Sequence, residues 1–131
     1  MSIKFKTIER VNPRDVAAVK KHYASVVTDG STNLEDLAEI VATQCTVSPA
    51  DCYAVLIALE SNIIRELKNG RIVHLGKLGS YRISVSSDGK ATSEEVLQST
   101  IKKARVLFRP GLGLRQMLKN LSYKKTQDQV A

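Results

Sequence analysis

Residues 48–86 read SPADCYAVLIALESNIIRELKNGRIVHLGKLGSYRISVS, and this stretch decides the fold. Its first four residues are typical of a helix start, because serine caps a free amide, proline suits the first helical position, and Asp51 can complete a capping box. Apolar residues then recur at steps of three and four, which predicts a broad apolar helix. Two neighbouring stripes share this face: Val55, Leu56, Leu59, Ile63 and Leu67, and beside them Tyr53, Ile57 and Ile64. A second subunit is expected to cover so wide a face.

Two strands follow this helix. Asn69-Gly70 is a C-terminal helix stop, and residues 71–75 are rich in branched side chains that favour a strand. The GKLG segment at 76–79 then predicts a turn. In the second strand Tyr81, Ile83 and Val85 alternate with Arg82, Ser84 and Ser86. Such alternation indicates a strand with one covered and one solvated face.

The remaining elements surround this stretch. Asn33 caps a helix predicted over 34–44, whose inner face holds Leu34, Leu37, Ala38 and Val41, and which forms a hairpin with the helix from Ser48. A polar arm at 86–100 leads to a return strand over 101–109 and a last helix over 112–121. The fold class is therefore α+β: a helical hairpin, a three-stranded antiparallel sheet with a β-arm, and a C-terminal helix.

Both ends of the chain differ from this central part. Residues 3–11 and 20–27 predict two strands, so residues 1–30 form an N-terminal extension, as a β-ribbon or alternatively as a partly ordered tail. Residues 31–123 form the main domain, and residues 124–131 are expected to be a flexible tail.

The composition favours an anionic partner. The 131 residues include 20 lysines and arginines against 13 acidic residues, and the isoelectric point is about 9.6. Twelve of the basic residues but only four acidic ones lie in residues 71–131, so the positive charge belongs to the strands and the C-terminus.

The residues that carry catalysis or bind metals are sparse. Cys45 and Cys52 have no Cys/His partners for a metal site, and are expected to be buried free thiols, with a disulfide as the open alternative. His22 and His74 are isolated, and Gly111-Leu112-Gly113 lacks the pattern of a dinucleotide site. No run of about 18 apolar residues occurs. We therefore predict a soluble intracellular protein that is no enzyme, has no metal or cofactor, and takes neither a membrane nor a small molecule as partner.

Two motifs carry a family resemblance. The first comprises LKNG at 67–70, VHL at 73–75 and LGSY at 78–81; the second comprises FRPG at 108–111 with LR at 114–115. Together with the order of elements over 34–121, they resemble the HU/IHF family of bacterial histone-like DNA-binding proteins, in a divergent variety with an N-terminal extension. The resemblance implies an intertwined homodimer whose two arms embrace double-stranded DNA in the bacterial nucleoid, within the cytoplasm.

The arm departs from the family pattern. No proline occurs between Pro49 and Pro110, so the wedge that kinks DNA in the usual family is missing. Ser84 and Ser86 occupy places where the family has arginines. The candidate tip holds Asp88, Glu94 and Glu95, which repel phosphates.

Basic residues remain at the base of the arm and on its return strand. The candidate DNA-binding residues are Arg82, Lys102, Lys103, Arg105, Arg109 and Arg115. Residues 103, 105 and 109 share one strand face, opposite Arg82 on the paired strand. Two hypotheses follow: a homodimeric, nucleoid-associated protein that binds DNA without sequence preference, or a dimeric scaffolding module with this fold and weak or no DNA binding.

Overall fold

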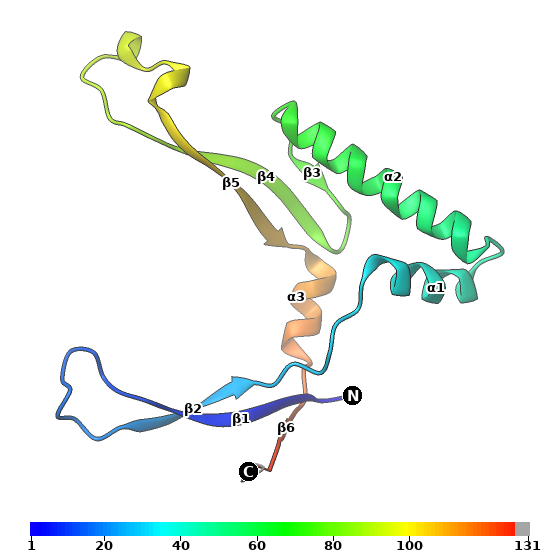
Figure 1. Ribbon diagram of the computed structural model, residues 1–131, viewed down its shortest axis with the longest axis vertical. Helices are drawn as coiled ribbons and strands as arrows, with labels where there is room; N and C mark the ends of the chain where they lie inside the picture. Colours follow the sequence, from blue (N-terminus) through cyan, green and yellow to red (C-terminus); the bar gives the residue numbers. More distant parts are fainter. Residues whose placement is uncertain (128–131) are drawn as a thin grey trace. The chain divides into compact units, whose positions relative to one another are not determined.

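The computed structural model describes residues 1–127, which form two compact units (Figure 1). One unit comprises Met1–Thr32 together with the C-terminal segment that begins at Leu118. The other unit is Asn33–Met117. Each unit contains a three-stranded sheet of its own, and the resulting mixture of helices and strands confirms the predicted α+β class.

The predicted helical hairpin is confirmed in the larger unit. Helix α1 spans Leu34–Gln44 and helix α2 spans Pro49–Lys68. At the start of α1, the Asn33 side chain accepts a hydrogen bond from the Asp36 amide at 2.8 Å, and the Asp36 carboxylate accepts one from the Asn33 amide at 3.0 Å. Ser48 Oγ accepts from the Asp51 amide at the start of α2. Both starts therefore follow local capping chemistry.

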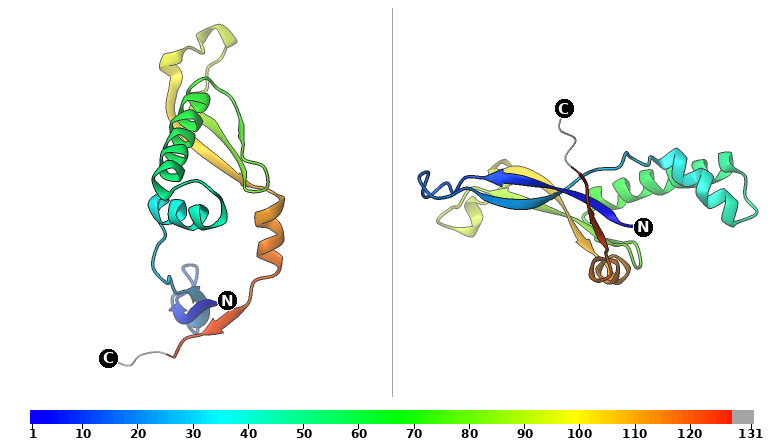
Figure 2. Two further views of the ribbon diagram at one scale, coloured as in Figure 1. Left: turned by 90° about the vertical axis from the view of Figure 1, so that its right-hand side faces the viewer. Right: turned by 90° about the horizontal axis from the view of Figure 1, so that it is seen from below.

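The sheet of the larger unit has the predicted antiparallel order β3–β4–β5. Strand β4 spans Gly79–Ser87 and strand β5 spans Ile101–Pro110, and in both views of Figure 2 they run side by side as an arm. Strand β3 is only Val73–His74, shorter than the predicted 71–75, because its ladder with β4 pairs just these two residues.

Short helical segments complete the larger unit. Two 3₁₀ turns, η1 at Ser93–Glu95 and η2 at Gln98–Thr100, lie between β4 and β5 at the end of the arm. Helix α3 follows β5 and spans Leu112–Lys119, somewhat shorter than the predicted 112–121.

Two glycines allow the motifs at 78–81 and 108–111 to meet. Gly79 has a φ of +145°, which favours glycine. A Cβ atom at Gly111 would lie 2.7 Å from the Lys77 carbonyl oxygen, closer than side chains come in proteins. The Gly111 amide donates to the Leu78 carbonyl at 2.8 Å. This glycine junction holds the start of β4 against the end of β5 and so fixes the base of the arm.

The smaller unit contains a sheet in the order β2–β1–β6. Strand β1 spans Ile3–Arg10 and pairs antiparallel with β2, Lys21–Val26. Strand β6, Tyr123–Lys125, pairs parallel with β1 and was not predicted. The tail predicted over 124–131 therefore begins with strand residues, held by a pairing between distant parts of the chain; residues 128–131 lie outside the described residues.

A single chain leaves its apolar faces open. Among the described residues, the buried apolar side chains are Ala38 and Cys52. On α2, by contrast, Val55 is 64% exposed and Ile64 57%, and the predicted inward residue Leu37 of α1 is exposed as well. None of the described helices is long and apolar enough to cross a membrane.

The two cysteines meet between α1 and α2 as free thiols. Their Sγ atoms are 4.0 Å apart; Cys52 is buried, whereas Cys45 is exposed at the end of α1. Burial raises the pKa of the Cys52 thiol above its usual value, and the neighbouring Cys45 raises it further. Within residues 1–127, no three His, Cys, Asp or Glu side chains gather as a metal site would require.

Candidate nucleic-acid interface

The register of the arm brings four predicted residues onto one face of the sheet. Across the β4–β5 ladder, Ser86 lies opposite Lys103, Ser84 opposite Arg105, Arg82 opposite Leu107, and Ser80 opposite Arg109. Residues opposite one another in an antiparallel ladder share a face, as do residues two apart on one strand. The basic face is defined by its cations Arg82, Lys103, Arg105 and Arg109, all of them exposed.

A groove lies at the base of this face. It has a volume of about 410 Å³. Its lining consists of Ile72, His74, Ser80, Arg82, Leu107, Phe108 and Arg109. His74 is paired with Ser80, which is paired in turn with Arg109, so the histidine belongs to the same transverse row as a predicted arginine. Sequence reasoning did not place His74 at this site, because its position beside Ser80 depends on the register between β3 and β4.

The positive charge of the basic face is not compensated. The ion pairs between described residues are Arg71–Glu66, at 2.6 Å, and Lys102–Asp88, at 2.7 Å. Neither pair includes a cation of the basic face. Its four cations are therefore available to an anionic ligand.

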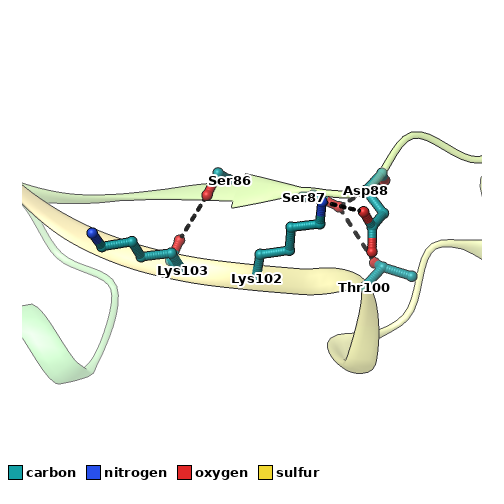
Figure 3. Close-up of polar contacts among 6 residues, drawn as sticks. All are labelled: Ser86, Ser87, Asp88, Thr100, Lys102 and Lys103. Carbon is teal, nitrogen blue, oxygen red and sulfur yellow. Dashed lines mark hydrogen bonds and ion pairs between the residues drawn. The ribbon is translucent and has the colours of Figure 1, made fainter.

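Lys102 is set apart from its neighbour Lys103 by a bulge. The register shifts between Ser86 and Ser87, whose partners are Lys103 and Ile101, so Lys102 is the extra residue. Figure 3 shows the consequence: the Lys102 side chain extends toward Asp88, and the Lys103 side chain extends the opposite way along the arm. The charge of Lys102 is thus partly balanced by a carboxylate.

Arg115, the remaining predicted residue, lies on α3 rather than on the sheet. Its backbone amide donates to the Gly111 carbonyl in the first turn of α3, and its side chain is exposed. Arg115 is not part of the β4–β5 ladder. The candidate site on the sheet therefore consists of the four cations of the basic face.

The arm tip is ordered by a buried hydroxyl. Thr100 is 6% exposed, and its Oγ1 donates to the Leu97 carbonyl at 2.6 Å. The Asp88 amide donates to the Thr100 carbonyl at 3.0 Å. Glu94 and Glu95 lie in the exposed turn η1. The tip therefore presents carboxylates on a backbone that hydrogen bonds within the tip hold in place.

The other side of the arm is apolar. This apolar face is defined by Tyr81, Ile83, Val85, Ala104, Val106 and Phe108. The rings of Tyr81 and Phe108 are 4.9 Å apart, centroid to centroid. Val106 is nevertheless 56% exposed and Ile83 42%. The same two strands thus present cations on one side and open apolar surface on the other.

Comparisons with solved structures show the same fold at low sequence identity. The whole chain aligns with 51% of a candidate bacterial DNA-binding protein from Bacteroides vulgatus, at 17% identity and a TM-score of 0.67. The chain therefore spans about half the length of that protein. A second similar structure is Anabaena HU in a cocrystal with DNA, at 21% identity and a TM-score of 0.52; the match covers 68% of this chain and 99% of that one.

Sequence comparisons place the chain in a family. Comparison with curated proteins finds no match. The model of the HU-HIG family, described as an HU domain fused to a wHTH, Ig or glycine-rich motif, matches residues 1–125. This match and the two similar structures confirm the resemblance to HU, and because it covers nearly the whole sequence, the protein belongs to the HU-HIG family.

Proposed function

We propose that this protein is a homodimeric, nucleoid-associated DNA-binding protein that grips the phosphate backbone of duplex DNA without sequence preference. The observation that carries the proposal is the basic face, where Arg82, Lys103, Arg105 and Arg109 are exposed on one side of two paired strands. Its cations form no ion pair with any residue in the described part of the chain. Neutralising phosphates releases condensed counterions and drives binding to any sequence.

The side chains of this face suit phosphates better than bases. Arginine, lysine and serine donate hydrogen bonds to phosphate oxygens, contacts that hold a protein on the duplex without reading its sequence. Ser84 and Ser86 lie between the cations in the same ladder and can add such donors. The aromatic rings Tyr81 and Phe108 belong to the apolar face, so base stacking is not expected from the basic face.

The family supports the choice of ligand. The Anabaena HU protein, which shares this fold, was crystallised with DNA. Bacterial HU-like proteins act on chromosomal DNA, so we expect this protein in the cytoplasm, at the nucleoid.

A second copy of the chain supplies the cover that the apolar surfaces need. Val55 and Ile64 on α2 and Val106 on the apolar face are more than half exposed in one chain. Fully burying a side chain of this size stabilises a structure by about 1.5 to 3 kcal/mol. An intertwined homodimer would bury α2 and the apolar face together and would double the basic face.

The test is a fluorescence anisotropy titration of random-sequence duplex over a series of salt concentrations. The unaltered protein should show log affinity falling linearly with log salt. The double variant Arg105→Ala/Arg109→Ala removes up to about four phosphate contacts per dimer, and each lost contact should flatten the slope by about 0.9. Affinity should fall for all duplex sequences alike.

A matched control removes the same charge elsewhere. Arg65→Ala/Lys68→Ala neutralises two exposed cations in the last turn of α2, which are not part of the β4–β5 ladder. This control should keep the slope of the unaltered protein. An unchanged slope in the Arg105/Arg109 variant would refute the basic face as the DNA surface.

The acidic tip favours one alternative, a dimeric scaffolding module with weak or no DNA binding. Asp88, Glu94 and Glu95 all lie at the tip, and Asp88 neutralises Lys102. A stable dimer that binds no duplex even at low salt would select this alternative, because backbone binding is strongest there.

A further inference from the structure

The sheet of the smaller unit also sorts its side chains by charge. In the β1–β2 ladder, Lys6 lies opposite Ser25, Ile8 opposite Tyr23, and Arg10 opposite Lys21. In the β1–β6 ladder, Lys4 lies beside Lys124. Since paired residues share a face, the ribbon face is defined by its cations Lys4, Lys6, Arg10, Lys21 and Lys124. All five are exposed.

No carboxylate in the strands balances this charge. The single acidic residue of β1, β2 and β6 is Glu9, which pairs with His22 and has the opposite parity. None of the five cations forms an ion pair with another residue in the range 1–127. The ribbon face therefore gathers five unpaired cations, one more than the basic face of the arm, on strands that do not belong to the arm.

Most apolar side chains of this sheet lie on the reverse side, whereas Ile8 and Tyr23 lie on the ribbon face. Ile3 and Phe5 share parity with Val26 across β2 and with Tyr123 on β6. Ile3 and Phe5 are half-buried, whereas Lys4 and Lys6 between them are exposed. The alternation thus separates lysines from apolar side chains over Ile3–Lys6 at the start of β1, whereas Ile8 and Glu9 interrupt the pattern toward its end.

A groove and a cation–π contact lie at the end of the ribbon face that contains Arg10 and Lys21. The Arg10 guanidinium lies over the Tyr23 ring, 5.8 Å from its centroid, which holds the arginine at the surface with its N–H groups free to donate. Arg10, Lys21 and Tyr23 also line a groove of about 580 Å³ beside the β1–β2 loop. Cations at the rim of a groove are well placed for an anionic backbone.

We propose that the ribbon face is a second binding surface for the phosphate backbone of duplex DNA, separate from the basic face of the arm. The choice of DNA as the ligand rests on the proposed function; the surface itself rests on the register and charge of β1, β2 and β6. A membrane fits less well, because a protein lying on lipid places a broad apolar surface beside its cations, whereas most apolar side chains of this sheet, such as Ile3, Phe5 and Val26, lie on the reverse face.

The spacing of the cations suits a duplex. Residues two apart on a strand are about 6.7 Å apart, close to the axial rise of two phosphates on one DNA strand at about 3.4 Å each. Lys4 and Lys6 follow this step along β1, and Lys124 on the neighbouring parallel strand β6 lies beside Lys4. A straight row of this kind can follow the backbone without reading bases.

The test is the triple variant Lys4→Ala/Lys6→Ala/Lys124→Ala in the full chain, measured by the same titration with a long random duplex. Each lost contact should flatten the salt slope by about 0.9, or up to about 2.7 per chain. The triple variant should also weaken the residual binding of Arg105→Ala/Arg109→Ala, because the two surfaces are proposed to act independently. An unchanged slope in both backgrounds would overturn the proposal.

Two adjacent lysines provide a matched control. Lys124 is on the ribbon face and Lys125, paired with Phe5, is on the reverse face of the same strand. Lys124→Ala should flatten the slope and Lys125→Ala should not; equal effects would overturn the assignment of the face. Circular dichroism must show the same fold for both variants.

The outcomes separate this proposal from the proposed function. If the arm variant has no effect and the triple variant does, the ribbon face binds DNA and the arm assignment fails. If only the arm variant has an effect, the ribbon proposal fails alone. The same variants are tested against duplex RNA and phosphatidylserine vesicles, and a loss of binding restricted to either of these would overturn DNA as the ligand.

Discussion

The two faces of the arm differ in chemistry although the same two strands form them. One face carries Arg82, Lys103, Arg105 and Arg109, and the other carries open apolar side chains such as Ile83 and Val106. Strand alternation places neighbours in sequence on opposite sides. Each strand can therefore serve two partners at once, an anion on one side and a second chain on the other.

The largest expected effect comes from placing one charge on each face in turn. Val106→Lys puts an ammonium group into the proposed dimer interface, where it loses about 1.5 to 3 kcal/mol of apolar burial per copy and adds the cost of a buried charge. Sedimentation and thermal unfolding should show a monomeric or unfolded chain.

Leu107→Lys is the matched change on the basic face. Leu107 lies opposite Arg82 and lines the groove, so the new lysine joins the cations there and its aliphatic stem can still cover the groove. This variant should remain dimeric and steepen the salt slope. A Val106→Lys variant that stays dimeric and fully folded would mean that the apolar face is not the dimer interface.

A smaller effect should separate Lys103 from Lys102. Lys103→Ala removes an unpaired cation of the basic face and should flatten the salt slope by about 0.9 per lost contact. Lys102→Ala removes a cation that Asp88 already balances at 2.7 Å and should change the slope much less. Equal losses in the two titrations would show that the bulge does not divide the surface.

The smallest effect is expected at the tip. The triple variant Asp88→Asn/Glu94→Gln/Glu95→Gln removes three carboxylates and releases Lys102 from its ion pair. Duplex affinity should stay the same or rise, because repulsion of phosphates is lost. A marked fall in affinity would mean that these acids make a functional contact.

Local signals in the sequence were sufficient for the helices and for the parity of the arm. The starts of α1 and α2 follow from Asn33 and Ser48, and the end of α2 follows from Gly70, since these capping roles depend only on nearby residues. The common face of Lys103, Arg105 and Arg109 follows from strand alternation alone.

Features that depend on distant pairing could not be predicted in this way. Strand β6 exists because Tyr123–Lys125 pairs with Ile3–Phe5 from the other end of the chain, and no local pattern indicates this. The bulge at Lys102 and its ion pair with Asp88 depend on the pairing of β4 with β5, so sequence reasoning included Lys102 among the candidate DNA-binding residues without showing that a carboxylate balances it. The exposure of Val106 and Ile83 reflects a face that one chain cannot cover.

If the basic face binds DNA as proposed, the bulge would also set the length of duplex that one arm can contact. From the row of Ser80 and Arg109 to the row of Ser86 and Lys103 the regular ladder advances roughly six residues, about 20 Å at about 3.3 Å each. At about 3.4 Å per base pair this corresponds to a footprint of about six base pairs. Adding two residues to each strand below the bulge would lengthen the footprint by about two base pairs, whereas the same addition beyond Asp88 would leave it unchanged. The position of one extra residue would thus determine the length of the proposed DNA-binding surface on the arm.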